Sequence, residues 1–229
     1  MKTIALVGDR SPAVRAHTRI PQALDAVREL EQLDLDVYWV PTTAAAEPDA
    51  LNGFDGIWLT PGSPYRNEAG GIAAAWTARS AGIPFLGTCA GFQHAMLEFA
   101  RGVCGLSDAR HAENEGPAGE DLIVELSCSL AGHEAAVDLA PGSLVERLIG
   151  ASRTVERYHC AYGLAAGSLD LLRAHGMRFT GHDDDGEVRV AELPGHPFFL
   201  VTLFQPELAG DDPHPLIRGF ARAVALKTP

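Results

Sequence analysis

Three features that would define other classes of protein are missing from this chain of 229 residues: long apolar runs, closely paired cysteines and an excess of positive charge. No stretch approaches the ~20 apolar residues that a membrane-spanning helix needs. The apolar run at residues 3–7 stops before Asp9, which makes it too short for a signal peptide. We therefore expect a cytoplasmic protein with no membrane partner.

The charge balance argues against nucleic acid as a partner. Eighteen Lys and Arg residues stand against 30 Asp and Glu residues, and the formal net charge of −12 repels a polyanion on average. The hydrophobic share of 46 % and the charged share of 21 % are ordinary for a globular protein. Because no repeat, low-complexity tract or long linker divides the chain, the sequence predicts a single domain over residues 1–229.

Only four cysteines are present, and none forms a C-x-x-C pair. This excludes a zinc ribbon and a dense disulfide framework. Cys104 ends an amphipathic segment, Cys128 lies in a strand-like run and Cys160 lies among aromatic residues, so packing is the commoner role for all three. Cys89 lies midway between Gly87 and Gly91, where a chemical role is a competing explanation.

The first half of the chain alternates strand-like and helix-like patterns. Apolar runs rich in strand formers are separated by segments long enough to hold helices. This alternation predicts a mainly parallel central sheet inside a three-layer α/β fold. The strand-like runs cover residues 3–7, 35–40, 56–59 and 83–87.

Apolar residues at helical spacing predict the connections between these strands. Ala23, Val27, Leu30 and Leu33 recur at such spacing after the first run, and Pro21 is compatible with the first turn of that helix. An alanine-rich segment at residues 72–81 and an amphipathic segment at residues 92–103 predict two further helices.

The second half of the chain predicts additional antiparallel strands joined by short turns. Turn signals such as Ala140-Pro141-Gly142 separate its apolar runs. The expected strands cover residues 122–126, 135–139, 188–193 and 198–204, and the expected helices cover residues 145–149, 169–174 and 216–225.

The segment Gly87-Thr88-Cys89-Ala90-Gly91 lies where a buried strand is expected to pass into a helix. A nucleophile on such a turn is held out at the top of the sheet, and the flanking glycines allow the backbone to approach closely. Free N–H groups at the start of the following helix favour a thiolate over a thiol. The setting indicates a nucleophile at Cys89, with a small buried cysteine in a tight turn as the open alternative.

Residues 83–93 read Ile-Pro-Phe-Leu-Gly-Thr-Cys-Ala-Gly-Phe-Gln, and similar matching segments extend over nearly the whole chain. In this respect the chain resembles the class I glutamine amidotransferases, and most of all the amidotransferase half of CTP synthase. The other matching segments are residues 4–8, 61–66, 98–101, 155–158, 192–207 and 214–216.

The resemblance implies an enzyme that attacks the side-chain amide of glutamine with a cysteine, releases ammonia and hydrolyses a glutamyl thioester. It implies that Cys89 is the nucleophile and that backbone N–H groups around Gly62 and Ala90 stabilise the oxyanion. It also places Gln93 and Glu98 against the bound glutamine, whereas from spacing alone both could belong to a solvated helix face. The family needs no cofactor or metal ion for this step, and none is expected here.

The sequence departs from the family where the proton relay is completed. A run near the end of the family's domain contains a triad histidine and glutamate, but here it reads Phe204-Gln205-Pro206-Glu207. Glu207 is retained, whereas the amide of Gln205 cannot take up a proton near neutral pH. Gln205 can therefore orient a partner but cannot act as general acid or base.

Two further departures affect substrate binding. The family's Arg-Tyr pair, which binds the carboxylate of glutamine, aligns with Ala161-Tyr162, so the guanidinium group is lost and Tyr162 remains. In the loop Gly62-Ser63-Pro64, the proline has no N–H group, which leaves one oxyanion donor fewer.

Another histidine could replace the missing base. His159 lies in the segment that departs from the family, and His94 follows the Cys89 turn. His196 belongs to a motif that the family shares, so we expect it to be structural. We keep His159 as the candidate substitute, with a surface or packing role as the alternative.

Two polar clusters are interpreted as loops rather than sites. The run from His182 to Asp185 contains possible metal ligands but precedes Gly186 between two strand-like runs, which is typical of a hairpin tip. The polar segment from His111 to Glu115 is likewise expected to be a solvated loop.

Three functional hypotheses follow. The first is a cysteine hydrolase acting on glutamine; the second is a module that binds a small ligand or regulates a partner after losing turnover. The third is hydrolysis of a different γ-glutamyl compound with a repurposed base. Because there is no G-x-x-x-x-G-K-[ST] loop and no length for a synthetase domain, any synthetase or ammonia acceptor would be a separate partner. The oligomeric state is left open, a homodimer included.

Overall fold

The structure is a computed structural model that describes residues 1–115, 121–126, 129–210 and 212–227. Within these residues, no helix is both long and apolar enough to cross a membrane. Nine strands form one sheet in the order β2-β1-β3-β4-β12-β11-β10-β7-β8, and three more form a small sheet in the order β5-β6-β9. The strands are β1 (Lys2–Val7), β2 (Leu35–Val40), β3 (Gly56–Leu59), β4 (Phe85–Thr88), β5 (Arg110–His111), β6 (Asp121–Glu125), β7 (Glu134–Leu139), β8 (Arg153–Arg157), β9 (Tyr162–Leu164), β10 (Arg178–His182), β11 (Val188–Glu192) and β12 (Phe199–Thr202).

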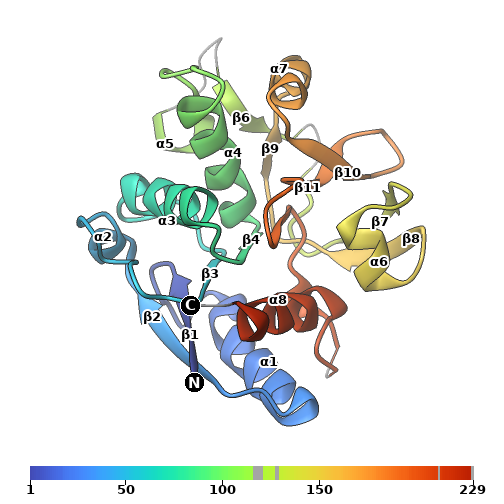
Figure 1. Ribbon diagram of the computed structural model, residues 1–229. Coiled ribbons are helices and arrows are strands. Elements are labelled where there is room, and N and C mark those ends of the chain that lie inside the picture. Colours follow the sequence, from blue (N-terminus) through green and yellow to red (C-terminus); the bar gives the residue numbers. More distant parts are fainter. Residues whose placement is uncertain (116–120, 127–128, 211, 228–229) are drawn as a thin grey trace.

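Helices cover both faces of the parallel part of the large sheet (Figure 1). Strands β2, β1, β3, β4 and β12 pair in parallel, whereas β12-β11-β10-β7-β8 pair antiparallel. The three-layer α/β prediction is therefore confirmed, including the antiparallel strands of the second half. The helices are α1 (Arg15–Glu31), α2 (Thr42–Ala45), α3 (Glu68–Ala81), α4 (Ala90–Gly102), α5 (Ala112–Glu115), α6 (Leu144–Ile149), α7 (Leu169–Ala174) and α8 (Pro215–Leu226), with 3-10 turns η1 (Ala166–Ser168) and η2 (Pro206–Leu208).

The first helix differs from its prediction. Helix α1 begins at Arg15, so Pro21 lies inside the helix rather than in its first turn. The buried face consists of Ile20, Leu24 and Val27, all fully inaccessible, whereas Leu30 is 59 % exposed. Burying three large apolar side chains outweighs the hydrogen bond that the proline cannot donate, so the helix runs through it.

The two polar segments that were interpreted as loops, residues 182–185 and 111–115, differ in the structure. Asp183 lies at the tip between β10 and β11, where its carboxylate accepts from the backbone N–H groups of Asp185 and Glu187, so the hairpin prediction is confirmed. The solvated-loop prediction for residues 111–115 is wrong, because His111 ends β5, is buried and is followed by α5. Strands β8, β9 and β10 were not predicted, since their sequences mix charged residues and glycine with few apolar ones.

The contact between α4 and the sheet depends on the absence of a side chain at Gly91. A Cβ atom at this position would lie 2.0 Å from the backbone oxygen of Leu59 in β3. Since that oxygen belongs to a buried strand, it cannot move away as a flexible side chain could. Gly91 therefore determines how closely the first turn of α4 approaches the sheet.

We expect Gly91→Ala to lower the free energy of unfolding by about 3 kcal/mol, because the steric clash exceeds the gain in helix propensity. Urea unfolding followed by circular dichroism measures this change. Gly167→Ala is the matched control, because nothing lies within 4 Å of the added atom there, and it should stay within about 0.5 kcal/mol of the wild type. Equal effects of the two substitutions would contradict the close approach.

Candidate active site

Cys89 forms the turn between β4 and α4, as the sequence predicted. Its backbone adopts φ 53° and ψ −106°, a positive φ that non-glycine residues rarely take. The Cys89 N–H group donates to the Thr202 oxygen at 2.9 Å, and the Cys89 oxygen accepts from Gln93 N–H at 3.2 Å. Bonds to β12 and to the first turn of α4 thus hold the strained turn in place.

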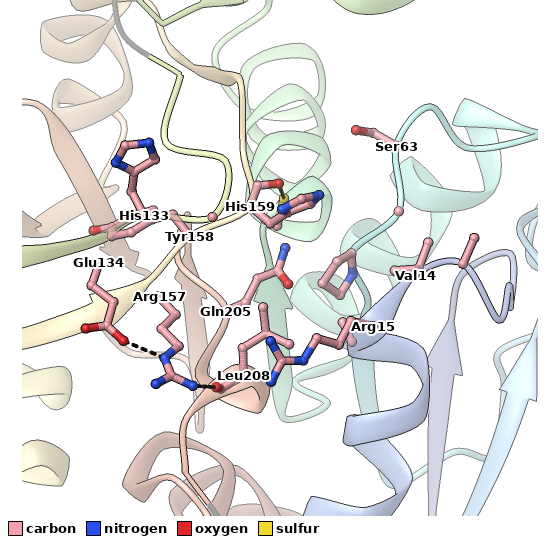
Figure 2. A pocket seen from close by; sticks show the side chains of 16 residues that line it. Val14, Arg15, Ser63, His133, Glu134, Arg157, Tyr158, His159, Gln205 and Leu208 are labelled. Carbon is pink, nitrogen blue, oxygen red and sulfur yellow. Dashed lines mark hydrogen bonds and ion pairs between the residues drawn. The ribbon is translucent and has the colours of Figure 1, made fainter.

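A cavity of about 690 Å³ opens over Cys89 (Figure 2). Its walls come from separate parts of the chain, namely the start of α1, the loop after β3, the segment before and into β7, the end of β8 and the turn around η2. The cysteine is 6 % exposed. The lining residues are Ala13, Val14, Arg15, Ala16, Pro61, Gly62, Ser63, Cys89, Gly132, His133, Glu134, Arg157, Tyr158, His159, Gln205 and Leu208.

The candidate oxyanion loop is held by His17, a residue that the sequence analysis missed. The ring accepts from Ser11 N–H through Nδ1 at 2.9 Å and donates from Nε2 to the Pro61 oxygen at 2.8 Å. Burial lowers the pKa of His17, which favours this neutral tautomer. Gly62 follows with φ 113°, and a Cβ atom there would lie 3.2 Å from the His17 ring. The loop therefore combines a rigid anchor with a conformation that favours glycine.

Gln205 reaches the cavity, but Glu207 lies behind it. Gln205 is 4 % exposed, and its side chain has no hydrogen-bond partner among the described residues. Glu207 is 2 % exposed; its Oε1 accepts from the Thr88 hydroxyl at 3.4 Å, while Oε2 has no partner within the described part of the chain. Desolvation raises the pKa of Glu207 to about 8. The acid of the predicted relay is therefore mostly neutral at pH 7.

Of the three histidines considered as substitutes, His159 alone lines the cavity. Its ring is exposed and its backbone oxygen accepts from the Cys89 thiol at 3.7 Å. His94 is buried, donates from Nδ1 to the Ala90 oxygen at 2.8 Å and has its pKa lowered by burial. His196 accepts from Phe198 N–H and lies 3.0 Å from the Ala78 oxygen, so its structural role is confirmed.

Cys160 was expected to be a packing residue, but its thiol also lies beside that of Cys89. Cys160 donates to the Leu203 oxygen at 3.1 Å and also contacts the Cys89 thiol. Burial, followed by the Cys89 contact, raises the pKa of Cys160, so this thiol stays protonated beside Cys89. Cys104 is partly buried, and Cys128 lies outside the described residues.

The residues that the resemblance places around glutamine lie away from the cavity. Gln93 donates to the Tyr162 oxygen at 2.9 Å and accepts from His111 Nε2 at 3.1 Å, so both ends of its amide are engaged. Burial lowers the pKa of His111 to about 4, which keeps the ring neutral between Gln93 and Tyr162. Ala90 starts α4 but does not line the cavity.

Glu98 requires a correction. Both of its carboxylate oxygens accept from Arg79, at 2.8 Å and 2.6 Å, and the residue is 2 % exposed. Its carboxylate joins α4 to α3 instead of facing the cavity, because a buried charge is retained only when it is paired. Neither a solvated helix face nor a substrate contact fits this geometry.

Five charged or titratable cavity residues were not predicted as site residues: Arg15, His133, Glu134, Arg157 and Tyr158. They come from three separate segments and form no local motif, so no sequence signal could have grouped them. In the part of the chain that the structure describes, no three His, Cys, Asp or Glu side chains gather as a metal site.

Comparisons with known proteins agree with the fold and identify the family. The profile of the family "Glutamine amidotransferase class-I" matches residues 22–191. CTP synthase of Rubrobacter xylanophilus is 33 % identical over 235 residues, which cover 96 % of this chain and 43 % of that protein. CTP synthase of Methanopyrus kandleri is 33 % identical over 99 % of this chain and 45 % of its own length. The chain thus spans less than half of these relatives.

A solved structure matches the chain over its whole length. The glutaminase domain of Trypanosoma brucei CTPS, determined with bound acivicin, has a TM-score of 0.90 and 27 % identity, covering 100 % of this chain and 95 % of that one. A glutamine amidotransferase from Thermotoga maritima has a TM-score of 0.59 and 10 % identity, covering 97 % of this chain and 96 % of its own, which supports the fold alone.

The buried Glu207 carboxyl predicts how stability depends on pH. Because its pKa rises from the usual value of 4.5 to about 8 on folding, the folded chain holds one more proton between these values. The free energy of unfolding should therefore fall as pH rises from about 4.5 to 8, on the order of 5 kcal/mol in total from this group. Glu207→Gln, which carries no titrating proton, should lose this dependence.

Chemical unfolding measured at several values between pH 5 and pH 8.5 tests this prediction. Glu29→Gln, on an exposed part of α1, serves as the control and should keep the wild-type slope. An unchanged slope in Glu207→Gln would show that this carboxyl group is already ionised at neutral pH.

Proposed function

Because the chain belongs to the class I glutamine amidotransferase family, related to the glutaminase domain of CTP synthase, we propose that it hydrolyses glutamine or a related γ-glutamyl amide with Cys89 as nucleophile. The supporting observation is the strained Cys89 turn at the base of a cavity. A nucleophile in this conformation is held above the sheet at the start of a helix, where the dipole stabilises negative charge.

The proposed reaction proceeds through a thioester. The Cys89 sulfur attacks the amide carbon, and the carbonyl oxygen takes the negative charge. Backbone N–H groups at Gly62, Ser63 and Ala90 are the proposed oxyanion donors, since the loop is anchored by His17 and Ala90 is the first residue of α4. The C–N bond then breaks with a proton transferred to the leaving nitrogen, and water hydrolyses the thioester.

Proton transfer is the step of the proposed reaction for which position 205 supplies no acid or base. Gln205 occupies the position of the missing histidine, and Glu207, the proposed acid of the relay, is left behind it without a basic partner. The proton for the leaving nitrogen must then come from water in the cavity or from His159, which is our candidate substitute. We therefore expect thioester formation to survive better than turnover. Gln93 remains a candidate for substrate contact if its hydrogen bonds with the Tyr162 backbone oxygen and with His111 open, and Tyr162 remains a second candidate.

A second candidate function is a small-ligand-binding or regulatory module without turnover. It is favoured by the replacement of the triad histidine by Gln205 and of the carboxylate-binding arginine by Ala161. A synthetase partner that uses the released ammonia is a further part of the first proposal, and its motivation is the similarity to CTP synthases, of which the chain spans 43 % and 45 %.

A chloroketone analogue of glutamine tests the nucleophile. We expect a single covalent adduct, located by peptide mass spectrometry on Cys89, because the turn places this sulfur at the base of a cavity that admits the reagent. Cys89→Ser should show no adduct at the same concentration. If the wild type stays unlabelled, the hydrolase proposal fails, and a thermal shift with glutamine then tests the binding alternative.

Gln205→His tests whether a broken relay limits turnover. An imidazole at this position would lie between the cavity and Glu207, and we expect the rate of ammonia release from glutamine to rise about 100-fold or more. The double variant Gln205→His/Glu207→Gln is the control and should lose most of this gain, because the ring is then oriented by a neutral amide. No rise in Gln205→His would mean that the pocket is built for another substrate.

A further inference from the structure

The cavity over Cys89 carries positive charge, although the whole chain has a net charge of −12. Two arginines and two histidines line it, against the single carboxylate of Glu134. Glu134 already accepts from Arg157 Nε at 2.7 Å. Among the described residues, Arg15 has no ion-pair partner, so its charge is left for a ligand or for solvent.

Helix α1 starts in the same wall. Residues 13–16 line the cavity, and the helix of 17 residues begins at Arg15. Val14 at the N-cap provides no side-chain hydrogen bond, and the first turn contains no acidic residue. The positive end of the helix dipole therefore borders the cavity, with no acidic side chain in its own first turn. Of the first N–H groups of α1, that of His17 already donates to the Val14 oxygen.

The buried amide of Gln205 points to a ligand independently of the helix. Gln205 lies among the side chains that line the cavity (Figure 2). Only 4 % of this residue is exposed, and its side chain has no hydrogen-bond partner among the described residues. Its amide group is not one of the fully buried polar groups that lack a partner in the described part of the chain, so it opens onto the cavity. A polar ligand in the cavity would satisfy it.

The volume and the lining residues of the cavity indicate which part of a substrate carries the charge. At about 690 Å³ it falls within the range of sites that enclose a whole small-molecule ligand, and a free amino acid would fill only part of it. Gln93 and Tyr162, the candidates for holding the glutamyl head, lie outside the cavity. The cavity therefore extends from Cys89 toward the other end of the amide, the amine portion.

We propose that the substrate is a γ-glutamyl amide whose amine portion carries a carboxylate or phosphate group, and that Arg15 and the start of α1 bind this anion. The inference rests on the proposed function, since Cys89 is taken as the group that attacks the amide. Arg15 pairs with the anion, the α1 N–H groups donate to it, and the Gln205 amide contacts the polar atoms between the anion and the reacting carbon.

The test compares three amides that differ only at the amine end: γ-glutamylglycine, γ-glutamyl-2-aminoethylphosphonate and the neutral γ-glutamylglycinamide. Their dissociation constants are measured by calorimetry with the full chain carrying Cys89→Ser, which prevents turnover. We expect at least one anionic compound to bind ten- to a hundredfold more tightly than the neutral amide, and the preference to weaken at high salt. The order of the two anionic compounds identifies carboxylate or phosphate as the group.

Arg15→Gln in the same background should remove the preference, and Arg15→Glu should reverse it. Arg66→Gln, which removes an equal charge from an exposed arginine outside the cavity, should leave it intact. Equal affinity for all three amides, no binding of any, or a preference that survives Arg15→Gln would overturn the inference. If the preference depends on Arg15 but the chloroketone does not label Cys89, the anion site stands and the hydrolase proposal fails. If the chloroketone labels Cys89 but the three amides bind equally well, the hydrolase proposal stands and the anion site fails.

Discussion

The constraint on which the rest of the site depends is the positive φ angle at Cys89. A non-glycine residue keeps this conformation only when its surroundings hold it there. The bond from Cys89 N–H to Thr202 ties the turn to β12, and the missing side chain at Gly91 lets α4 pack against Leu59. Sheet, turn and helix are thereby joined within three residues, and the thiol is left at the base of the cavity.

In the proposed reaction, the groups around this turn would support the attack, whereas Gln205 cannot serve in proton transfer. The helix start and the oxyanion loop held by His17 are both present. Behind them, Glu207 is buried with one oxygen unpaired, and its raised pKa follows from that burial. An unprotonated histidine beside it would accept a hydrogen bond, and a protonated one would form an ion pair. With Gln205 at this position, the Glu207 carboxyl group has neither a histidine hydrogen bond nor an ion pair. The same buried carboxyl group therefore bears on the proposed proton transfer and on the pH dependence of the free energy of unfolding.

The arrangement of the remaining polar groups separates two regions. On one side, Gln93, His111 and Tyr162 satisfy one another inside the protein. On the other side, Arg15 and Gln205 face open volume with no partner among the described residues. Arg15 is exposed to solvent, whereas Gln205 is a buried residue. Since buried polar groups are normally paired, Gln205 is the residue of this region at which a ligand would contribute most. The charges of this region are also opposite in sign to the net charge of the chain, which would draw an anion into it.

Local patterns were enough to predict the alternating strands, the helix α4 and the turn at Cys89, because period, glycine placement and strand length act within a few residues. The prediction that Gln205 stands where the family has a histidine came from the resemblance to the family and not from a local pattern. Local patterns could not place Pro21, because packing of Ile20 and Leu24 decided where α1 starts. Nor could they show that Arg79 takes both oxygens of Glu98, that Cys160 touches Cys89, or that Arg15 faces the cavity. Such contacts join segments that are distant along the chain, and only the paired strands and packed helices bring them together.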